Sequence, residues 1–197
     1  IFNKHGKIHG FSGRDMKPAS QSRPKWKHLG KKKNWIYPLY VDPRCQKDIE
    51  KRNAIIIVES IGDMLSLREQ GFFNVLPCFG LSVSTKLACA LVQINPEHIF
   101  ISLNNDTNST ENRGEDASFK NYLNLLSFFD KDKIKICLPN KTDFGDMSSN
   151  DFDHWVKKYE NVKSSNQVPI ILEKCNKLAK QGKISKTLAK KIKLINE

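Results

Sequence analysis

The stretch Ala54-Ile55-Ile56-Ile57-Val58-Glu59 decides the fold class. Five consecutive apolar residues, four of them β-branched, are typical of a short strand that is buried on both faces of a parallel sheet. The run ends on a carboxylate, and a helical pattern follows over residues 62–70, with Gly71 at the position of a helix C-cap. A buried strand that leads directly into a helix indicates an α/β protein.

Strand and helix patterns continue to alternate on the C-terminal side of this run. Apolar runs and amphipathic periods predict further strands at 74–76, 98–103 and 133–138, and further helices at 84–94 and 115–129. The sequence therefore predicts a mostly parallel sheet with helices on both faces.

Segments of different composition flank this predicted α/β domain. Residues 1–53 are rich in Gly, Pro and aromatic residues, which favours a small mixed α+β subdomain of short strands and loops that ends in a polar linker or surface helix. Residues 151–197 form a Lys-rich helical segment with two helical stretches separated by Gly182. We therefore expect three parts, at 1–53, 54–150 and 151–197.

The net charge of +12 is divided unevenly among segments of the chain. Residues 1–53 carry 14 Lys and Arg against 4 Asp and Glu, a net charge of +10. Residues 54–156 carry 8 against 14, a net charge of −6, and residues 157–197 carry 11 against 3, a net charge of +8. An acidic centre with basic flanks suits a protein that gathers cations at one site and polyanions around it, although a solvated lysine-rich surface would also explain the C-terminal excess.

Several protein classes are excluded by composition. No apolar run approaches the roughly 18 residues that would predict a membrane span. The chain begins without a signal-peptide pattern and looks like an excised piece of a longer protein. Its five cysteines are scattered without a Cys-x-x-Cys pair, which favours neither a zinc site nor a disulfide framework and predicts a reducing cytoplasmic location.

Carboxylates follow three of the predicted strands. Glu59 ends the first strand, Asp106 follows the strand at 98–103, and Asp143 and Asp146 follow the last strand. Because parallel strands present their carboxyl ends at one edge of a sheet, we expect these side chains to converge. Such oxygen ligands suit a hard divalent cation such as Mg²⁺, whereas each residue taken alone fits a helix cap or a solvated turn equally well.

Segments of this region resemble the TOPRIM metal-binding domain. They match its glutamate motif, the glycine loop after its second strand, its Asp-x-Asp position, the glycine-containing helix start that follows, and the closing Leu-Pro…Asp segment: Val58–Met64, Pro77–Ser82, Asn104–Asp106, Arg113–Ala117 and Leu138–Asp143. The resemblance covers residues 54–150.

The resemblance implies a Mg²⁺ or Mn²⁺ site with a catalytic Glu59, acting as ligand or general base, and a catalytic Asp106. It also implies Asn104, Asp143 and Asp146 as metal ligands. This sequence has Asn104 where the family has an aspartate, and an amide is a weaker magnesium ligand. Phage-type primases show similar Asn-Asn-Asp variants, so the site resembles a variant rather than a lost one.

The basic N-terminal part resembles DnaG-like DNA primases, including their phage-type members. Gly6–Arg14, Arg23–Trp26 and Trp35–Tyr40 are similar to consecutive segments of that family. The resemblance implies that Arg14 and Lys25 line a basic groove for template and nucleotides. Lys27 would extend that surface, and Trp26 would either stack on bases or pack in the core.

The sequence therefore predicts the catalytic core of a DNA primase, which joins ribonucleoside triphosphates into short RNA primers on a single-stranded DNA template. A replicative helicase is a further expected partner, and host cytoplasm is the expected location if the protein is phage-encoded. A TOPRIM nuclease or a topoisomerase-related fragment is one alternative, although a topoisomerase needs a nucleophilic Tyr from another domain. A non-catalytic nucleic-acid-binding module is the other.

Overall fold

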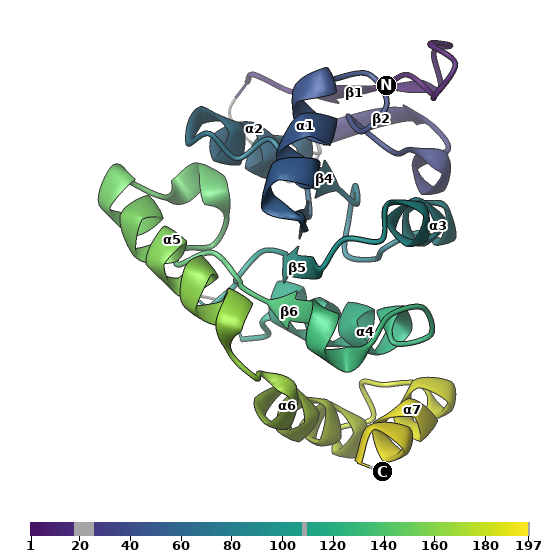
Figure 1. Ribbon diagram of the computed structural model, residues 1–197, viewed down its shortest axis with the longest axis vertical. Coiled ribbons are helices and arrows are strands. Elements are labelled where there is room, and N and C mark those ends of the chain that lie inside the picture. Colours follow the sequence, from purple (N-terminus) through teal and green to yellow (C-terminus); the bar gives the residue numbers. More distant parts are fainter. Residues whose placement is uncertain (18–25, 108–109, 197) are drawn as a thin grey trace.

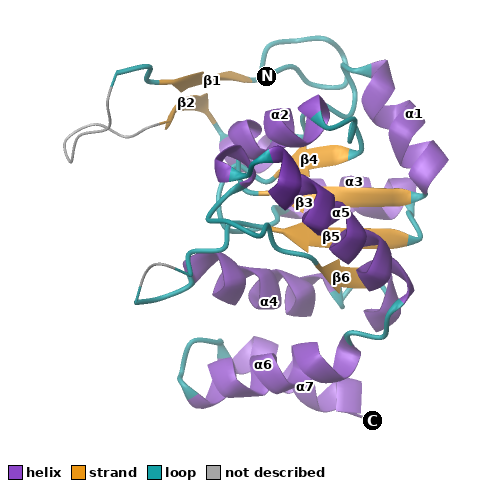
Figure 2. Ribbon diagram, turned by 90° about the vertical axis from the view of Figure 1, so that its left-hand side faces the viewer, coloured by secondary structure: helices purple, strands orange, loops and turns teal. Residues whose placement is uncertain are grey.

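The central element of the structure is a four-stranded parallel sheet. The computed structural model describes residues 1–17, 26–107 and 110–196. Its four parallel strands lie in the order β4-β3-β5-β6; their bounds are β3 Ala54–Val58, β4 Val75–Pro77, β5 His98–Ser102 and β6 Ile134–Ile136. These four strands point in one direction, so their carboxyl ends share one edge of the sheet (Figure 2). The predicted α/β class with a mostly parallel sheet is confirmed.

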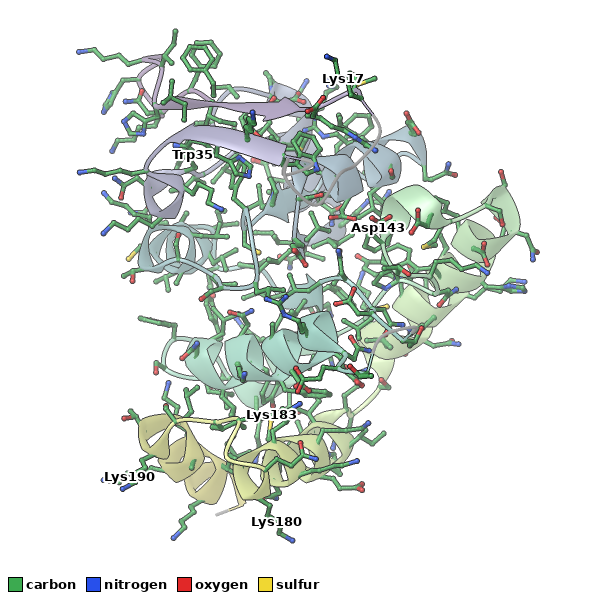
Figure 3. The ribbon with its side chains drawn as sticks, turned by 180° about the vertical axis from the view of Figure 1, so that it is seen from behind. Lys17, Trp35, Asp143, Lys180, Lys183 and Lys190 are labelled. Atoms are coloured by element: carbon green, nitrogen blue, oxygen red, sulfur yellow. The ribbon has the colours of Figure 1, made fainter. Side chains whose placement is uncertain are left out.

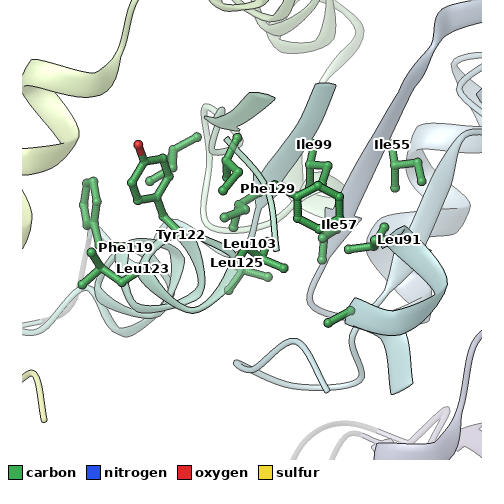
Figure 4. Packing of buried hydrophobic residues seen from close by; sticks show 14 of the residues in the cluster. Ile55, Ile57, Leu91, Ile99, Leu103, Phe119, Tyr122, Leu123, Leu125 and Phe129 are labelled. Carbon is green, nitrogen blue, oxygen red and sulfur yellow. The ribbon is translucent and has the colours of Figure 1, made fainter. Parts of the chain in front are cut away.

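Helices cover both faces of this sheet (Figure 1). Their bounds are α1 Pro43–Arg52, α2 Ile61–Glu69, α3 Thr85–Ile94, α4 Arg113–Leu125 and α5 Ser149–Ser164. Successive side chains of β3 enter different cores: Ile55 and Ile57 pack among residues of α3 and α4, whereas Ile56 packs among residues of α2 and α5. This alternation explains why the sequence of β3 is apolar throughout. Figure 4 shows the first core, with Ile55, Ile57 and Leu91.

Helix α5 is an element that the sequence interpretation did not identify separately. It starts with a capping box between Ser148 and Asp151, and it buries Phe152, Trp155 and Tyr159 on one face. These aromatic side chains cover the sheet beside α2, so the packed layers continue past residue 150. The predicted division of the chain at 150 stays a prediction.

The basic N-terminal part contains a two-stranded antiparallel sheet, as expected of short strands and loops. Strand β1 (Gly10–Arg14) pairs with β2 (Trp26–Gly30). Trp35, which follows β2, lies against Gly10 and Gly30 of the hairpin and joins it to the loop after β4, where its ring centroid is 4.8 Å from that of Phe79. Trp35 is only 2% exposed, which makes it the main apolar anchor of this part.

The C-terminal segment forms the two predicted helices, α6 (Val168–Lys180) and α7 (Lys186–Asn196). Both pack against α4, at the end of the molecule farthest from the hairpin (Figure 1). Lys183 donates to Asp116 at 2.9 Å, and Lys191 donates to the carbonyl of Leu123 at 3.0 Å. Within the described ranges, no helix has the length and apolar character needed to cross a bilayer.

Candidate active site

The carboxyl edge of the sheet gathers negative charge around Glu59. This residue directly follows β3, and its half-buried carboxyl has a pKa raised from 4.5 to about 7. Burial is the largest cause, and the nearby carboxylates of Asp63, Asp106 and Asp143 add to it, while Arg113 opposes them. Asp106 and Asp143, which follow two other strands, therefore lie close enough to Glu59 to raise its pKa.

Hydrogen bonds between loops hold Asp106 at this edge. The Asn112 side-chain oxygen accepts from the backbone N–H of Asp106 at 3.0 Å and of Glu115 at 3.1 Å, so one residue caps α4 and fixes the Asp106 loop. The Asn112 amide donates to Asn105, whose own side chain donates to the carbonyl of Pro139 in the loop after β6. Asn112 and Asn105 thereby position the Asp106 loop beside the loop that carries Asp143.

Asn104, the predicted variant ligand, lies against the first turn of α4. A Cβ placed on Gly114 would be 2.7 Å from the carbonyl carbon of Asn104, closer than van der Waals contact allows. The helix can approach this loop only because residue 114 is a glycine. Gly114 therefore sets the distance between α4 and the Asn104–Asp106 segment.

Asp63 is a buried carboxylate to which sequence reasoning assigned no role. It is 3% exposed, accepts from the hydroxyl of Ser60 at 2.7 Å, and accepts from the backbone N–H of Phe144 at 3.3 Å. Burial raises its pKa, and the Asp143 carboxylate does so too. The sequence signal is the spacing Ser60-x-x-Asp63, which marks a capping box; its contact with the loop at residue 144 required the structure.

A small pocket of about 110 Å³ joins the acidic edge to the basic hairpin. It is lined by residues from the hairpin, from α2 and from the loop after β6: Arg14, Trp26, Ser60, Gly62, Asp63, Ser66, Asp143, Gly145 and Asp146. The guanidinium of Arg14 lies over the ring of Trp26, 5.9 Å from its centroid. Asp143 lies between the hairpin and α5 in Figure 3. Arg14 and Trp26, which are far from the acidic residues in sequence, thus line one pocket with Asp143 and Asp146.

Of the predicted hairpin residues that the structure describes, Lys27 does not line this pocket. Lys27 is exposed on β2 next to Trp26, and neighbouring side chains of a strand point to opposite faces. The structure therefore places Lys27 away from Asp143. Lys25 lies outside the described residues.

The oxygen donors at this edge fit a hard divalent cation. In the part of the chain that is described, no three Asp, Glu, His or Cys side chains converge closely enough to enclose a metal ion. Mg²⁺ commonly binds through one or two carboxylates, with water and substrate phosphates completing its shell. The pKa of Glu59 is raised first by burial and then by the carboxylates of Asp63, Asp106 and Asp143, which is negative charge that a cation would neutralise. One or two carboxylates among Glu59, Asp106 and Asp143 would hold it.

Comparison with known proteins gives a fold but no sequence relative. No model of a protein family matches the chain, and no curated protein matches it. Several solved structures, in contrast, match the chain in fold. The zinc-binding and RNA polymerase domains of the Aquifex aeolicus primase align with 98% of this chain and 49% of their own, at 19% identity and a TM-score of 0.63.

Two further structures give the same result. A DnaG primase catalytic domain bound to single-stranded DNA aligns with 80% of this chain and 50% of its own, at 19% identity and a TM-score of 0.60. The primase fragment of the bacteriophage T7 primase-helicase protein aligns with 80% of this chain and 59% of its own, at 16% identity and a TM-score of 0.54. The predicted likeness to DnaG-like primases is confirmed for the fold. The chain spans about half the length of the DnaG-type primase structures that it resembles.

Proposed function

We propose that this chain is part of the catalytic core of a DNA primase, which joins ribonucleotides into short RNA primers on single-stranded DNA. The observation that carries the proposal is the pocket in which Arg14 and Trp26 meet Asp63, Asp143 and Asp146. A polymerase needs cationic groups that bind template and nucleotide phosphates, and beside them carboxylates that hold the catalytic metal ion. The fold shared with primase catalytic cores supports this reading.

The residues at the carboxyl edge take distinct parts in this proposal. Glu59, Asp106 and Asp143 would hold Mg²⁺ or Mn²⁺, which supplies charge neutralisation at the triphosphate and lowers the pKa of the attacking hydroxyl. Where it holds no cation, Glu59 would instead act as a general base, since the pKa of its carboxyl is then raised to about 7. Asp63 keeps the loop at Phe144 in place by accepting a hydrogen bond from the backbone N–H of Phe144.

In this proposal the hairpin residues bind the nucleic acid. Arg14 is exposed and offers a planar guanidinium for a phosphate oxygen, and the half-buried Trp26 lines the same pocket. Phosphate contacts position a template without reading its sequence, as a primer-making polymerase requires. Lys25, Lys27 and a replicative helicase partner stay predictions from the sequence.

The test is primer synthesis from labelled ribonucleotides on single-stranded DNA, with Mg²⁺ or Mn²⁺. The unmodified chain is expected to make short RNA products, and Glu59→Gln to make none while keeping its affinity for single-stranded DNA within about twofold. Asn104→Asp is a second variant, expected to raise synthesis because a carboxylate holds a divalent cation better than an amide. Equal synthesis by the unmodified chain and Glu59→Gln would contradict the proposal, as would nucleotide-independent cleavage of the DNA.

A further inference from the structure

The two C-terminal helices and the turn between them, Val168–Asn196, carry eight lysines and one glutamate. Three of these lysines attach the segment to α4. Lys174 lies 3.7 Å from Glu115, Lys183 lies 2.9 Å from Asp116, and Lys191 donates to the carbonyl of Leu123. They neutralise the acidic first turn of α4 and bind carbonyls near its end, so their charges are compensated within the protein.

The other five lysines are exposed and take no part in this attachment: Lys177, Lys180, Lys186, Lys190 and Lys193. Lys186, Lys190 and Lys193 are separated by four and three residues, so they form one stripe about 10 Å long on a single face of α7. Ile192, which is 3% exposed, lies on the opposite face and packs in the core. Figure 3 shows Lys180 and Lys190 projecting from the outer surface of these helices.

This lysine stripe (Lys186, Lys190 and Lys193) has the chemistry of a phosphate-binding surface. Among the described residues, none of its three lysines has an ion-pair partner. The sequence from 168 to 196 contains no aromatic residue that could stack on a base. Proteins that bind single strands rely on such stacking, whereas a duplex hides its bases and presents regularly spaced phosphates.

We infer that the lysine stripe of α7 binds the phosphate backbone of a nucleic acid duplex. The turn before α7 lies beside the start of α4, where Lys183 reaches Asp116, and α4 starts next to the Asp106 loop. A duplex that leaves the carboxyl edge of the sheet in this direction runs along the outer face of α7. The inference rests on the proposed function only in identifying that duplex as the newly made primer paired with its template.

The experiment measures binding of a blunt DNA duplex, and of an RNA–DNA hybrid, over a range of salt concentrations, without nucleotides or divalent metal. The triple variant K186Q/K190Q/K193Q should reduce the slope of log affinity against log salt by about 3, since each lost phosphate contact removes about 0.9. The matched control is K47Q/K51Q/K157Q, which removes the same charge from exposed positions of α1 and α5 and should leave the slope within about 0.5 of the original. Gln has a helix propensity close to that of Lys, so both variants are expected to fold.

The inference would be overturned by an equal loss of slope in both triple variants, which would reflect net charge alone. An equal loss of affinity for single-stranded DNA and duplex in the stripe variant would also overturn it, as would unchanged duplex binding, which would leave an acidic protein as the partner of this face. The binding measurement uses neither nucleotides nor divalent metal, so its outcome does not depend on primer synthesis. Failure of the proposed primer synthesis is therefore distinguishable from failure of this inference.

Discussion

Glu59 holds its proton to an unusually high pH for a carboxyl group. Its pKa is raised from 4.5 to about 7, first by burial and then by the carboxylates of Asp63 and Asp106. The folded protein therefore binds a proton at Glu59 between about pH 4.5 and 7, whereas the unfolded chain has released it. The folded state binds more protons in that window. The contribution of Glu59 to the stability of the folded state is therefore complete below about pH 4.5 and is lost as the pH rises through about 7.

Glu59→Gln removes this ionisation, so we expect the variant to be more stable than the unmodified protein at pH 8. The difference should shrink as the pH falls and disappear below about pH 4.5. Thermal unfolding in metal-free buffer measures it, with Glu69→Gln on the exposed end of α2 as the control. Addition of Mg²⁺ should raise the melting temperature of the unmodified protein and not that of Glu59→Gln. A difference that is constant with pH would contradict the assignment of the raised pKa to Glu59.

At the scale of elements, the start of α4 depends on a residue without a side chain. Gly114 lies in the first turn of that helix and packs against the backbone of Asn104, at a separation that leaves no room for a Cβ. Gly62 in α2 is a contrasting case, because a Cβ there would lie 3.3 Å from the hydroxyl of Ser60 and 3.5 Å from Trp26. Each glycine is the second residue of its helix and precedes an acidic residue, but only Gly114 lacks the space for a Cβ.

Gly114→Ala is expected to destabilise the protein by about 1–3 kcal/mol, because overpacking outweighs the roughly 1 kcal/mol that alanine contributes to a helix. Displacement of the Asn104–Asp106 loop should also weaken Mn²⁺ binding. Urea unfolding and metal titration measure the two effects. Gly62→Ala is the matched control and should change the free energy of unfolding by less than about 1 kcal/mol. Equal effects of the two substitutions would contradict the close packing of α4 on this loop.

At the scale of the whole molecule, one set of contacts connects the basic hairpin to Glu59. Trp35 packs edge-on against the rings of His28 and Phe79, and Lys32 donates to the carbonyl of Phe79 at 3.0 Å. Phe79 has a φ of +58°, and the N–H of the following Gly80 donates to the carbonyl of Glu59 at 3.0 Å. The segment that docks the hairpin is therefore the one that holds the backbone of Glu59.

Trp35→Ala is expected to lower the free energy of unfolding by about 3–5 kcal/mol, since it empties a large buried site. Because the hairpin carries Arg14 and Trp26, the same variant should lose affinity for single-stranded DNA. Trp35→Phe keeps a ring against Phe79 and should lose less of both. Urea unfolding and DNA-binding titrations check this, and limited proteolysis should show faster cleavage in the hairpin of the alanine variant. Unchanged DNA binding by Trp35→Ala would contradict the docking role.

The sequence by itself determined the parallel sheet and the carboxylates at its edge. The apolar run at 54–58 and the alternation of strand and helix patterns after it are local features of the sequence. A parallel strand that is buried on both faces must be apolar throughout, so the sequence shows it directly. Glu59, Asp106 and Asp143 could be placed together because parallel strands share one carboxyl edge. Helix α5 also has a local signal, in its capping box and in the spacing of Phe152, Trp155 and Tyr159, which the interpretation of 151–197 passed over.

Only the tertiary structure decided which distant residues meet these carboxylates. Asp63 reaches the loop at Phe144, 81 residues away, and Arg14 enters the pocket of Asp143, whereas Lys27 points elsewhere. Such contacts depend on how the hairpin docks through Trp35 and on which face of a strand a side chain occupies. Alternation along a strand separates Arg14 and Trp26 from Lys27 in the sequence, but it does not show which face of the hairpin meets the carboxylates. That choice follows from the shape and burial of surfaces that form only when the chain has folded.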